Sequence, residues 1–413
     1  MNILERSMVI RMKNILLDAS TGRLLTMEQS EIDRRIKAAR KLMKDKGVGM
    51  ILIVNPGKGG YRYWFTGVSG PERPSEGGIL IGSEGNVISV MGAALLPMGN
   101  ETEQNFSQAK MGGGSVFEGV QEQEGFYETT IKALLKEEKT VGVVNASWLR
   151  SDLSDFLKKI LPDVNFSDLT EEAEWLVAQK STAELEMMQE VAAMMDKIFH
   201  GAYLNVKAQV YERDIANAMR YAAYQLGCGG PDYQESAKLS LVSNRDGAPM
   251  DKEELIYPGR KVTEGDRINL KMYCLGNNCC YGFLARSFVL GKPCEKTKKL
   301  WETAAAAQQY GAELLKPGVK IREAAEKING YLKQQGCKAD EGTFLHGIGY
   351  HVDENPKQYD SSEEKPLEEG MLLVIEPTAS DGIQDGICCG DVFVVTGEGA
   401  VRINHFPQEL ISL

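Results

Sequence analysis

The stretch Thr343-Phe-Leu-His-Gly-Ile-Gly-Tyr350 decides the fold, together with Glu354-Asn-Pro356 and Val374-Ile-Glu-Pro377 downstream of it. These motifs set one histidine, His346, and one glutamate, Glu376, beside glycine and proline at fixed intervals. Histidine and carboxylate side chains are groups that bind cations or move protons in enzyme sites. The motifs therefore mark the candidate site of the chain.

Bulk composition is that of an ordinary globular protein. At 413 residues the chain is long enough for two domains, and its 43% hydrophobic and 25% charged residues are usual values. The formal net charge of −11 argues against a nucleic-acid partner, because phosphate binding requires a basic face. No segment reaches the roughly 18 consecutive apolar residues that a membrane-spanning helix needs. We therefore expect neither nucleic acid nor membrane among the partners.

The cysteines all follow residue 227. They are Cys228, Cys274, Cys279, Cys280, Cys294, Cys337, Cys388 and Cys389. No Cys-x-x-Cys pair occurs, so the spacing fits neither a zinc ribbon nor a redox dithiol. The start of the chain interleaves charged with apolar side chains, which is unlike a secretory leader. The sequence predicts a cytoplasmic protein whose thiols stay free in a reducing environment.

The first part of the chain alternates helix and strand signals. Apolar residues recur at helical spacing from Ile32 to Met43, and Gly47 is placed to end that helix. Apolar runs predict strands at 50–54, 78–81, 87–90 and 140–144, and a helix follows from about 147 to 160. The polar, glycine-rich stretch 104–124 is interpreted as a surface excursion. This alternation predicts an α/β domain.

A second domain begins near residue 180. Lys180-Ser-Thr-Ala-Glu184 contains a capping box, in which Ser181 and Glu184 satisfy free N–H groups that open a helix. That helix is predicted to about residue 203, with further helices at 212–226, 296–314 and 321–335 and strands near 236–242, 267–274, 281–290, 371–376 and 391–396. We place the two domains at residues 1–178 and 179–413.

Together these features resemble the pita-bread peptidase family, which comprises creatinase, prolidase, aminopeptidase P and methionine aminopeptidase. The segments Arg34–Gly67 and Lys180–Glu184 resemble the starts of its two domains. The motifs around His346 and Glu376 resemble its metal-site signature. The resemblance implies an α/β N-terminal domain followed by an α+β pita-bread C-terminal domain, assembled as a homodimer.

The metallopeptidases of this family hold two cations with two Asp, one His and two Glu. By resemblance, only His346 and Glu376 of these ligands are retained. Lys271 and Phe283 stand at the two Asp positions, and Gly390 stands at the last Glu position. Two cations about 3.5–4 Å apart need several carboxylates to bridge them, whereas Lys271 adds a positive charge. We therefore expect no metal and no other cofactor.

Lys271 and Arg286 are the basic residues expected at the site. The ammonium of Lys271 can occupy the volume and charge of a lost cation and pair with Glu376. Such a pair either stabilises negative charge during a reaction or fills an inactive site as a structural ion pair, and the sequence leaves both open. Arg286 precedes the apolar run Ser287-Phe-Val-Leu290 and is predicted to stabilise negative charge as well.

His346 and His351 are the best available general bases, since the unperturbed pKa of histidine is about 6.5. A satisfied structural histidine is the alternative for His346. Asp353 stands where the peptidases have a second catalytic His. Phe283, His351 and Asp353 are predicted to line the substrate site.

Creatinase shows that this fold can cleave a C–N bond without a metal, but two of its features are absent here. The loop Ser243–Met250 lacks the histidine that shuttles protons in creatinase, and Ala285 replaces a catalytic Glu. Arg73-Pro74 resembles a creatinase pair that holds a substrate carboxylate in the neighbouring subunit's site. A planar guanidinium suits that role, with a solvated arginine as the alternative.

Cys388 is the remaining candidate for the substrate site. It should share a strand face with Gly390, because side chains alternate along a strand. A thiolate nucleophile, a soft-metal ligand and a small buried apolar residue are the alternatives for Cys388, and Cys279 has the same ones.

The leading functional prediction is a metal-independent, creatinase-like hydrolase of a C–N bond in a small, carboxylate-bearing substrate. In it, His346 and Glu376 move protons, Lys271 and Arg286 stabilise negative charge, and Arg73 binds the substrate. Loss of the shuttle histidine and of three ligands favours, as an alternative, a non-catalytic binding or scaffold protein with the same fold. An Xaa-Pro peptidase with a remodelled metal site is the third interpretation.

Overall fold

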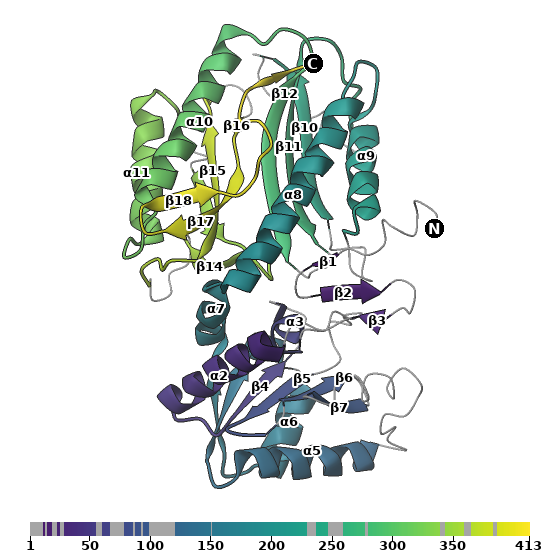
Figure 1. Cartoon of the computed structure of the whole chain (residues 1–413), viewed down its shortest axis with the longest axis vertical. Helices are drawn as coiled ribbons and strands as arrows, with labels where there is room; N and C mark the ends of the chain where they lie inside the picture. Colours follow the sequence, from purple (N-terminus) through teal and green to yellow (C-terminus); the bar gives the residue numbers. More distant parts are fainter. Residues whose placement is uncertain are drawn as a thin grey trace. The chain divides into compact units, whose positions relative to one another are not determined.

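The structure is a computed structural model that describes residues 11–12, 15–18, 23–24, 29–54, 60–66, 78–85, 87–91, 94–98, 120–149, 151–228, 237–246, 259–276, 280–338, 343–358, 365–382 and 386–413 of the chain. The chain divides into two compact units, residues 1–177 and 178–413 (Figure 1). Within the described ranges, no helix is both long enough and apolar enough to cross a membrane.

The first unit is built on a six-stranded sheet with the order β7-β6-β5-β4-β8-β9. Its strands are β4 (Met50–Val54), β5 (Gly78–Gly82), β6 (Val87–Met91), β7 (Ala94–Met98), β8 (Thr140–Val144) and β9 (Asn165–Asp168). The helices are α2 (Gln29–Lys46), α3 (Tyr61–Thr66), α5 (Val120–Leu135), α6 (Ser151–Ile160) and α7 (Thr170–Ala178), which runs to the unit boundary. A separate three-stranded sheet consists of β1 (Arg11–Met12), β2 (Ile15–Asp18) and β3 (Arg23–Leu24).

The apolar runs of the sequence form the core of this unit. β4 and β5 are buried along their whole length, and β8 pairs with β4 in parallel. Gly47 directly follows the last residue of α2 and has a φ of +64°, a left-handed conformation that glycine adopts without steric cost. The predicted α/β organisation is confirmed. The surface excursion predicted for residues 104–124 is wrong from residue 120 onward, because α5 begins there. Residues 101–119 lie outside the described part of the chain.

The second unit contains two sheets, with orders β10-β11-β12-β19 and β14-β13-β15-β17-β18, and β16 pairs with β15. The first sheet consists of β10 (Ala237–Arg245), β11 (Asp266–Leu275), β12 (Tyr281–Val289) and β19 (Ile411–Ser412). The second consists of β13 (Thr343–Gly347), β14 (Glu354–Lys357), β15 (Leu372–Ala379), β16 (Ile387–Cys388), β17 (Asp391–Thr396) and β18 (Gly399–Arg402).

Each sheet is covered by one pair of helices (Figure 1). α8 (Thr182–Asn205) and α9 (Glu212–Gln225) pack on β12 and β10, while α10 (Glu295–Leu314) and α11 (Ile321–Gln334) pack on β15 and β13. The predicted capping box opens α8: Ser181 Oγ accepts from Glu184 N over 3.2 Å, and Glu184 Oε2 accepts from Ser181 N over 2.8 Å. The α+β arrangement predicted for this half of the chain is confirmed.

The prediction that all thiols stay free is wrong for two cysteines. Cys228, which follows α9, forms a disulfide with Cys274 in β11. The two are 46 residues apart in the sequence and meet only because α9 packs on the sheet that contains β11. Local spacing rules therefore gave no sign of this pair.

Candidate functional site

The candidate site lies between the two sheets of the second unit. An isolated antiparallel bridge joins the sheets there: Ala285 N donates to Gly390 O over 2.9 Å, and Gly390 N donates to Ala285 O over 3.1 Å. β11 and β12 contribute residues from one sheet, and β13, β15 and the start of β17 contribute residues from the other. The five family ligand positions therefore come from both sheets.

Lys271 and Glu376 form an ion pair at the centre of the site. Lys271 Nζ lies 2.5 Å from Glu376 Oε2, and the Lys271 side chain is 31% exposed while that of Glu376 is 5% exposed. The rings of Phe344, Phe283 and Tyr273 surround the ammonium, with centroids 4.9, 5.6 and 5.9 Å from Nζ. The structure thus holds a positive charge directly against the retained carboxylate.

His346 is fully buried on β13, and both of its ring nitrogens are engaged. Nδ1 lies 2.7 Å from the carbonyl oxygen of Gly347, so we assign the proton to Nδ1; Tyr273 Oη, 3.1 Å from Nε2, then donates to Nε2. Burial lowers the pKa of His346 to about 4, against the opposing effects of the Gly347 carbonyl and of Asp353. At neutral pH, His346 is therefore an uncharged hydrogen-bond acceptor that meets the rest of the site through Tyr273.

Tyr273 and Phe344 are site residues that the sequence interpretation misses. Each lies two positions from a candidate on the same strand, Tyr273 after Lys271 and Phe344 before His346. Side chains two residues apart on a strand lie on the same face, so this alternation could have predicted Tyr273 and Phe344 as site residues. Tyr273 also stands opposite Phe283 on the neighbouring strand, with ring centroids 4.6 Å apart.

Phe283 fills the space that a larger residue at position 390 would need. The Phe283 side chain is fully buried. A Cβ built on Gly390 would lie 2.8 Å from Phe283 Cε1, 3.0 Å from Ala285 Cβ and 3.1 Å from Glu376 Cγ. A glutamate at position 390 therefore does not fit beside Phe283. Two of the former ligand positions are occupied by an aromatic ring and by a glycine that makes room for it.

The donor atoms at these five positions do not fit a two-metal centre. His346 and Glu376 supply the donors, but both nitrogens of His346 are hydrogen-bonded and Glu376 is paired with an ammonium. Among the residues that the structure describes, no three His, Cys, Asp or Glu side chains form a group that could hold a metal ion. Since two bridged cations need several carboxylates, the site disagrees with the two-metal chemistry of the family that the motifs resemble.

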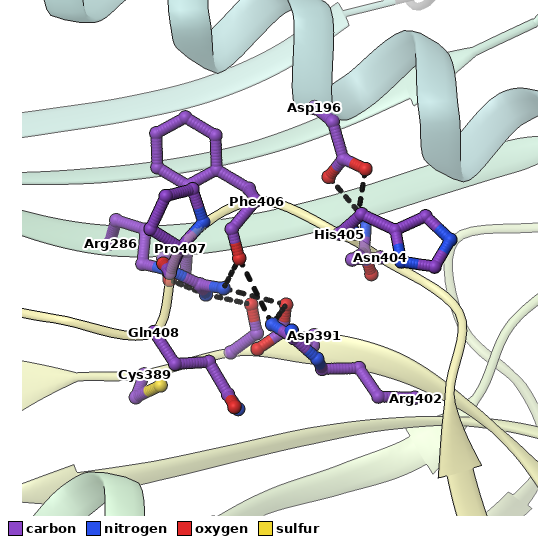
Figure 2. Close-up of polar contacts among 12 residues, drawn as sticks. Asp196, Arg286, Cys389, Asp391, Arg402, Asn404, His405, Phe406, Pro407 and Gln408 are labelled. Carbon is purple, nitrogen blue, oxygen red and sulfur yellow. Dashed lines mark hydrogen bonds and ion pairs between the residues drawn. The ribbon is translucent and has the colours of Figure 1, made fainter.

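Arg286 lies on the face of β12 opposite to Phe283, in a polar cluster with Asp391, Phe406 and Pro407 (Figure 2). Its side chain is fully buried, and its guanidinium donates to Asp391 Oδ1 over 2.7 Å and to the carbonyl oxygens of Ala285, Gly390, Phe406 and Pro407. Burial opposes the charge, but Asp391 outweighs it and the pKa of Arg286 is raised. This geometry favours a positioning role, in which Arg286 holds the backbone of Gly390, over the predicted stabilisation of negative charge.

Asp391 and Cys389 belong to the same buried network. Gln308 Nε2 donates to Asp391 Oδ2 over 3.0 Å, and Arg402 Nη1 lies 3.5 Å from Asp391 Oδ1. Cys389 Sγ lies 3.5 Å from Gln308 Oε1. Burial raises the pKa of Cys389 to about 12, so its thiol stays protonated at neutral pH and is not a nucleophile.

The remaining sequence candidates receive less support from geometry. Arg73 and Cys279 lie outside the described residues. The backbone of Cys388 in β16 pairs with that of Thr378 in β15, and the Cys388 side chain lies outside the described part of the structure. His351 N donates to Glu354 Oε1 over 2.9 Å, and the His351 ring stands 6.5 Å from that of Tyr281. Asp353 Oδ1 lies 3.7 Å from His346 Nδ1. The roles assigned to these residues stay predictions.

Comparison with known sequences identifies the family. The profile described as metallopeptidase family M24 matches residues 186–406, and that of the creatinase/prolidase N-terminal domain matches residues 35–176. The chain belongs to metallopeptidase family M24, which confirms the family predicted from the motifs.

Individual relatives match between about two thirds and nearly all of the chain. It is similar to the Xaa-Pro dipeptidase of Pyrococcus horikoshii, with 23% identity over 92% of this chain and 99% of that protein. The Xaa-Pro dipeptidase of Pyrococcus furiosus is 24% identical over 68% of this chain and 78% of that protein.

Solved structures of prolidases share the fold. The prolidase from Pyrococcus horikoshii superposes with a TM-score of 0.70 at 22% identity, covering 92% of this chain and 100% of that one. A recombinant prolidase from Thermococcus sibiricus gives a TM-score of 0.73 at 19% identity, covering 94% and 100%. At these identities the likeness establishes the fold alone, and the predicted two-domain pita-bread fold is confirmed.

Proposed function

We propose that this protein hydrolyses the C–N bond of small, carboxylate-bearing substrates of the Xaa-Pro dipeptide class, and that it does so without a two-metal centre. The substrate class is supported by family membership and by relatives named Xaa-Pro dipeptidase. These relatives favour dipeptides over the creatinase-type substrates expected first from the sequence. A cytoplasmic location and a homodimer stay predictions alongside this function.

The observation that carries the metal-independent part is the contact between Lys271 Nζ and Glu376 Oε2, at 2.5 Å. A cation bound to Glu376 would have to displace this ammonium or lie beside it, and like charges at that distance repel strongly in a poorly solvated site. Lys271 thus supplies, within the protein, part of the positive charge that metal ions supply in metallopeptidases.

The ion pair has the chemistry that hydrolysis requires. Attack of water on the carbonyl carbon places negative charge on the carbonyl oxygen, and the ammonium of Lys271 can stabilise it. The carboxylate of Glu376 can accept the proton of the attacking water and pass it to the leaving nitrogen as the C–N bond breaks. His346 is less suited to this task than the sequence predicts, since it is buried with a lowered pKa. Arg73 remains the proposed partner of the substrate carboxylate.

A non-catalytic binding protein is the second candidate. The packing of Phe283 against Gly390 favours this candidate. By resemblance, both positions bind the catalytic metal ions in the family, whereas here one is a phenylalanine and the other a glycine that leaves space for its ring. In that case the site would still select a ligand, and the ion pair of Lys271 with Glu376 would bind it without turnover.

The test combines metal analysis with substrate assays on protein purified without chelator. Leu-Pro, Gly-Pro and creatine are incubated with the protein in the presence of EDTA and, separately, of added Mn²⁺. We expect hydrolysis of an Xaa-Pro dipeptide that survives EDTA and is lost in both Glu376→Gln and Lys271→Met. Lys298→Met is the matched control, because it removes a lysine from an exposed pair with Glu295 on α10.

Each alternative has its own outcome. Hydrolysis that requires Mn²⁺ would reject metal independence and restore the metallopeptidase. Stabilisation of the protein by a dipeptide without product formation would select the binding protein. Neither binding nor turnover of any dipeptide would reject the proposed substrate class.

A further inference from the structure

The ammonium of Lys271 occupies an aromatic cage. The rings of Tyr273, Phe283 and Phe344 all have their centroids within 6 Å of Nζ, at 5.9, 5.6 and 4.9 Å. Glu376 closes the cage with a carboxylate 2.5 Å from Nζ. Several aromatic faces around a cation, completed by a carboxylate, are the arrangement by which proteins recognise organic ammonium groups.

Two members of the cage are more deeply buried than the lysine that fills it. Phe283 is fully buried and the Glu376 side chain is 5% exposed, whereas Tyr273 and Phe344 are half-buried and the Lys271 side chain is 31% exposed. Lys271 therefore reaches the cage from a side that solvent also reaches. Its flexible stem allows the ammonium to leave while the walls, which are packed on two sheets, stay in place. A lysine in this position is a tethered occupant that another ammonium can replace.

The ion pair is also complementary in charge to the proposed substrates. A dipeptide with free ends is a zwitterion, with an α-ammonium at one end and a carboxylate at the other. If the α-ammonium takes the cage and pairs with Glu376, Lys271 is released to meet the carbonyl or carboxylate oxygen of the same ligand. Both charges then keep a partner, which avoids the cost of leaving the buried Glu376 carboxylate unpaired.

We propose that Tyr273, Phe283, Phe344 and Glu376 form a binding site for the free α-ammonium of the ligand, and that Lys271 occupies this site when no ligand is bound. The inference rests on the proposed function for the identity of the ligand. The cage itself can be tested without any turnover. Ligands with a blocked amino terminus, such as N-acetyl-Gly-Pro, should bind more weakly than Gly-Pro.

The experiment uses n-propylammonium chloride as the probe, because it reproduces Cγ, Cδ, Cε and Nζ of the lysine that Lys271→Ala removes. The melting temperature of the full chain is followed during titration, with n-propanol as a neutral probe of the same shape and NaCl as an ionic control. A tethered competitor acts at an effective concentration in the millimolar range or above, so Lys271→Ala should bind the probe about tenfold or more tightly than the wild type.

Two variants test the parts of the cage. Lys271→Met keeps the volume of the occupant without its charge and should not respond to n-propylammonium. Lys271→Ala combined with Glu376→Gln should lose the response, since the carboxylate no longer attracts the cation. The proposal is overturned if the wild type and Lys271→Ala respond equally, if n-propanol acts as well as n-propylammonium, or if the double variant responds like Lys271→Ala.

A measurement on the wild type covers the case in which Lys271→Ala does not fold. Trinitrobenzenesulfonate labels free lysine amines, and its site is mapped by mass spectrometry. Tetramethylammonium, which carries no reactive amine, should increase the labelling of Lys271 by displacing it and leave that of exposed Lys298 unchanged. Unchanged labelling of Lys271 refutes displacement. Failure of the hydrolysis assay would leave these binding results intact, so the two proposals fail separately.

Discussion

The packing of Phe283 against Gly390 leads to a prediction that a double-mutant cycle can test. Gly390→Ala adds one methyl group, which would lie 2.8 Å from Phe283 Cε1, 3.0 Å from Ala285 Cβ and 3.1 Å from Glu376 Cγ. Ordinary contacts between such carbon atoms are about 3.5–4.0 Å, so the Phe283 ring must move by about 0.7 Å or more and the other two neighbours by a few tenths of an ångström. The neighbours are held by the sheet bridge and by buried ring packing and have little freedom to do so.

The expected cost follows from these contacts. Overpacking a tight core by a methyl group costs about 1–3 kcal/mol, and three simultaneous short contacts place Gly390→Ala in the upper half of that range. Phe283→Leu removes the ring edge that makes the shortest contact, at a cost of its own of about 1–2 kcal/mol for lost burial. Because the smaller side chain makes room for the methyl group, the double variant should be more stable than the sum of the two costs by about 1 kcal/mol.

The assay is urea unfolding of the four proteins, compared by their midpoints while the slope stays constant. Gly397→Ala is the matched control, since a Cβ at Gly397 meets nothing within 4 Å and should change the free energy of unfolding by less than about 0.5 kcal/mol. Additive costs in the double variant would refute the reasoning, because they would mean that Phe283 does not occupy the space beside Gly390.

Three further predictions concern the same unit. The pKa of His346 is about 4 in the folded protein, below the value of about 6.5 expected in the unfolded chain. Between these two pH values the native state binds fewer protons than the unfolded state, so the free energy of unfolding should fall by roughly 3 kcal/mol as the pH drops from 6.5 to 4. A series of unfolding measurements against pH should be flatter for His346→Gln, and an unchanged slope would contradict this. Reduction of the Cys228–Cys274 disulfide, which spans 46 residues, should cost roughly 4 kcal/mol in the chain-entropy account, so a reductant should lower the melting temperature of the wild type but not that of a variant with serine at both positions. Elemental analysis of protein purified without chelator should find far less than the two equivalents of transition metal that a dinuclear site of this family holds, and about two equivalents per chain would contradict the donor geometry.

The sequence predicts those parts of the fold that have a local signal. β11 and β15 read as strands because apolar residues dominate or alternate in them, and α8 begins at its capping box. α5 is not predicted, because its polar residues and its glycine interrupt the helical spacing of apolar residues. The pairing of Lys271 with Glu376 joins residues 105 apart and follows only from the register of two family motifs.

The site shows both a missed signal and a limit. Alternation along β12 places Arg286 on the face opposite to Phe283, so the placement of Arg286 could have been inferred. Its actual partners are Asp391 and the backbone carbonyl oxygens of Ala285, Gly390, Phe406 and Pro407, and this set has no signature in the sequence. The lowered pKa of His346 is likewise beyond prediction, because it results from complete burial in the folded protein.

The replacements around the former metal positions are consistent with one another. The half-buried Lys271 ammonium lies beside aromatic rings, and Glu376 supplies the carboxylate that pairs with it. Tyr273 donates a hydrogen bond to His346 Nε2, and Gly390 leaves room for the Phe283 ring. Random loss of ligands would leave unpaired charge or empty volume, both of which destabilise a core. Selection for stability alone explains a satisfied core. The partial exposure of the Lys271 side chain, 31% against 5% for Glu376, spares the ammonium the full cost of desolvation. The same exposure is what would let a ligand reach the pair, as proposed above.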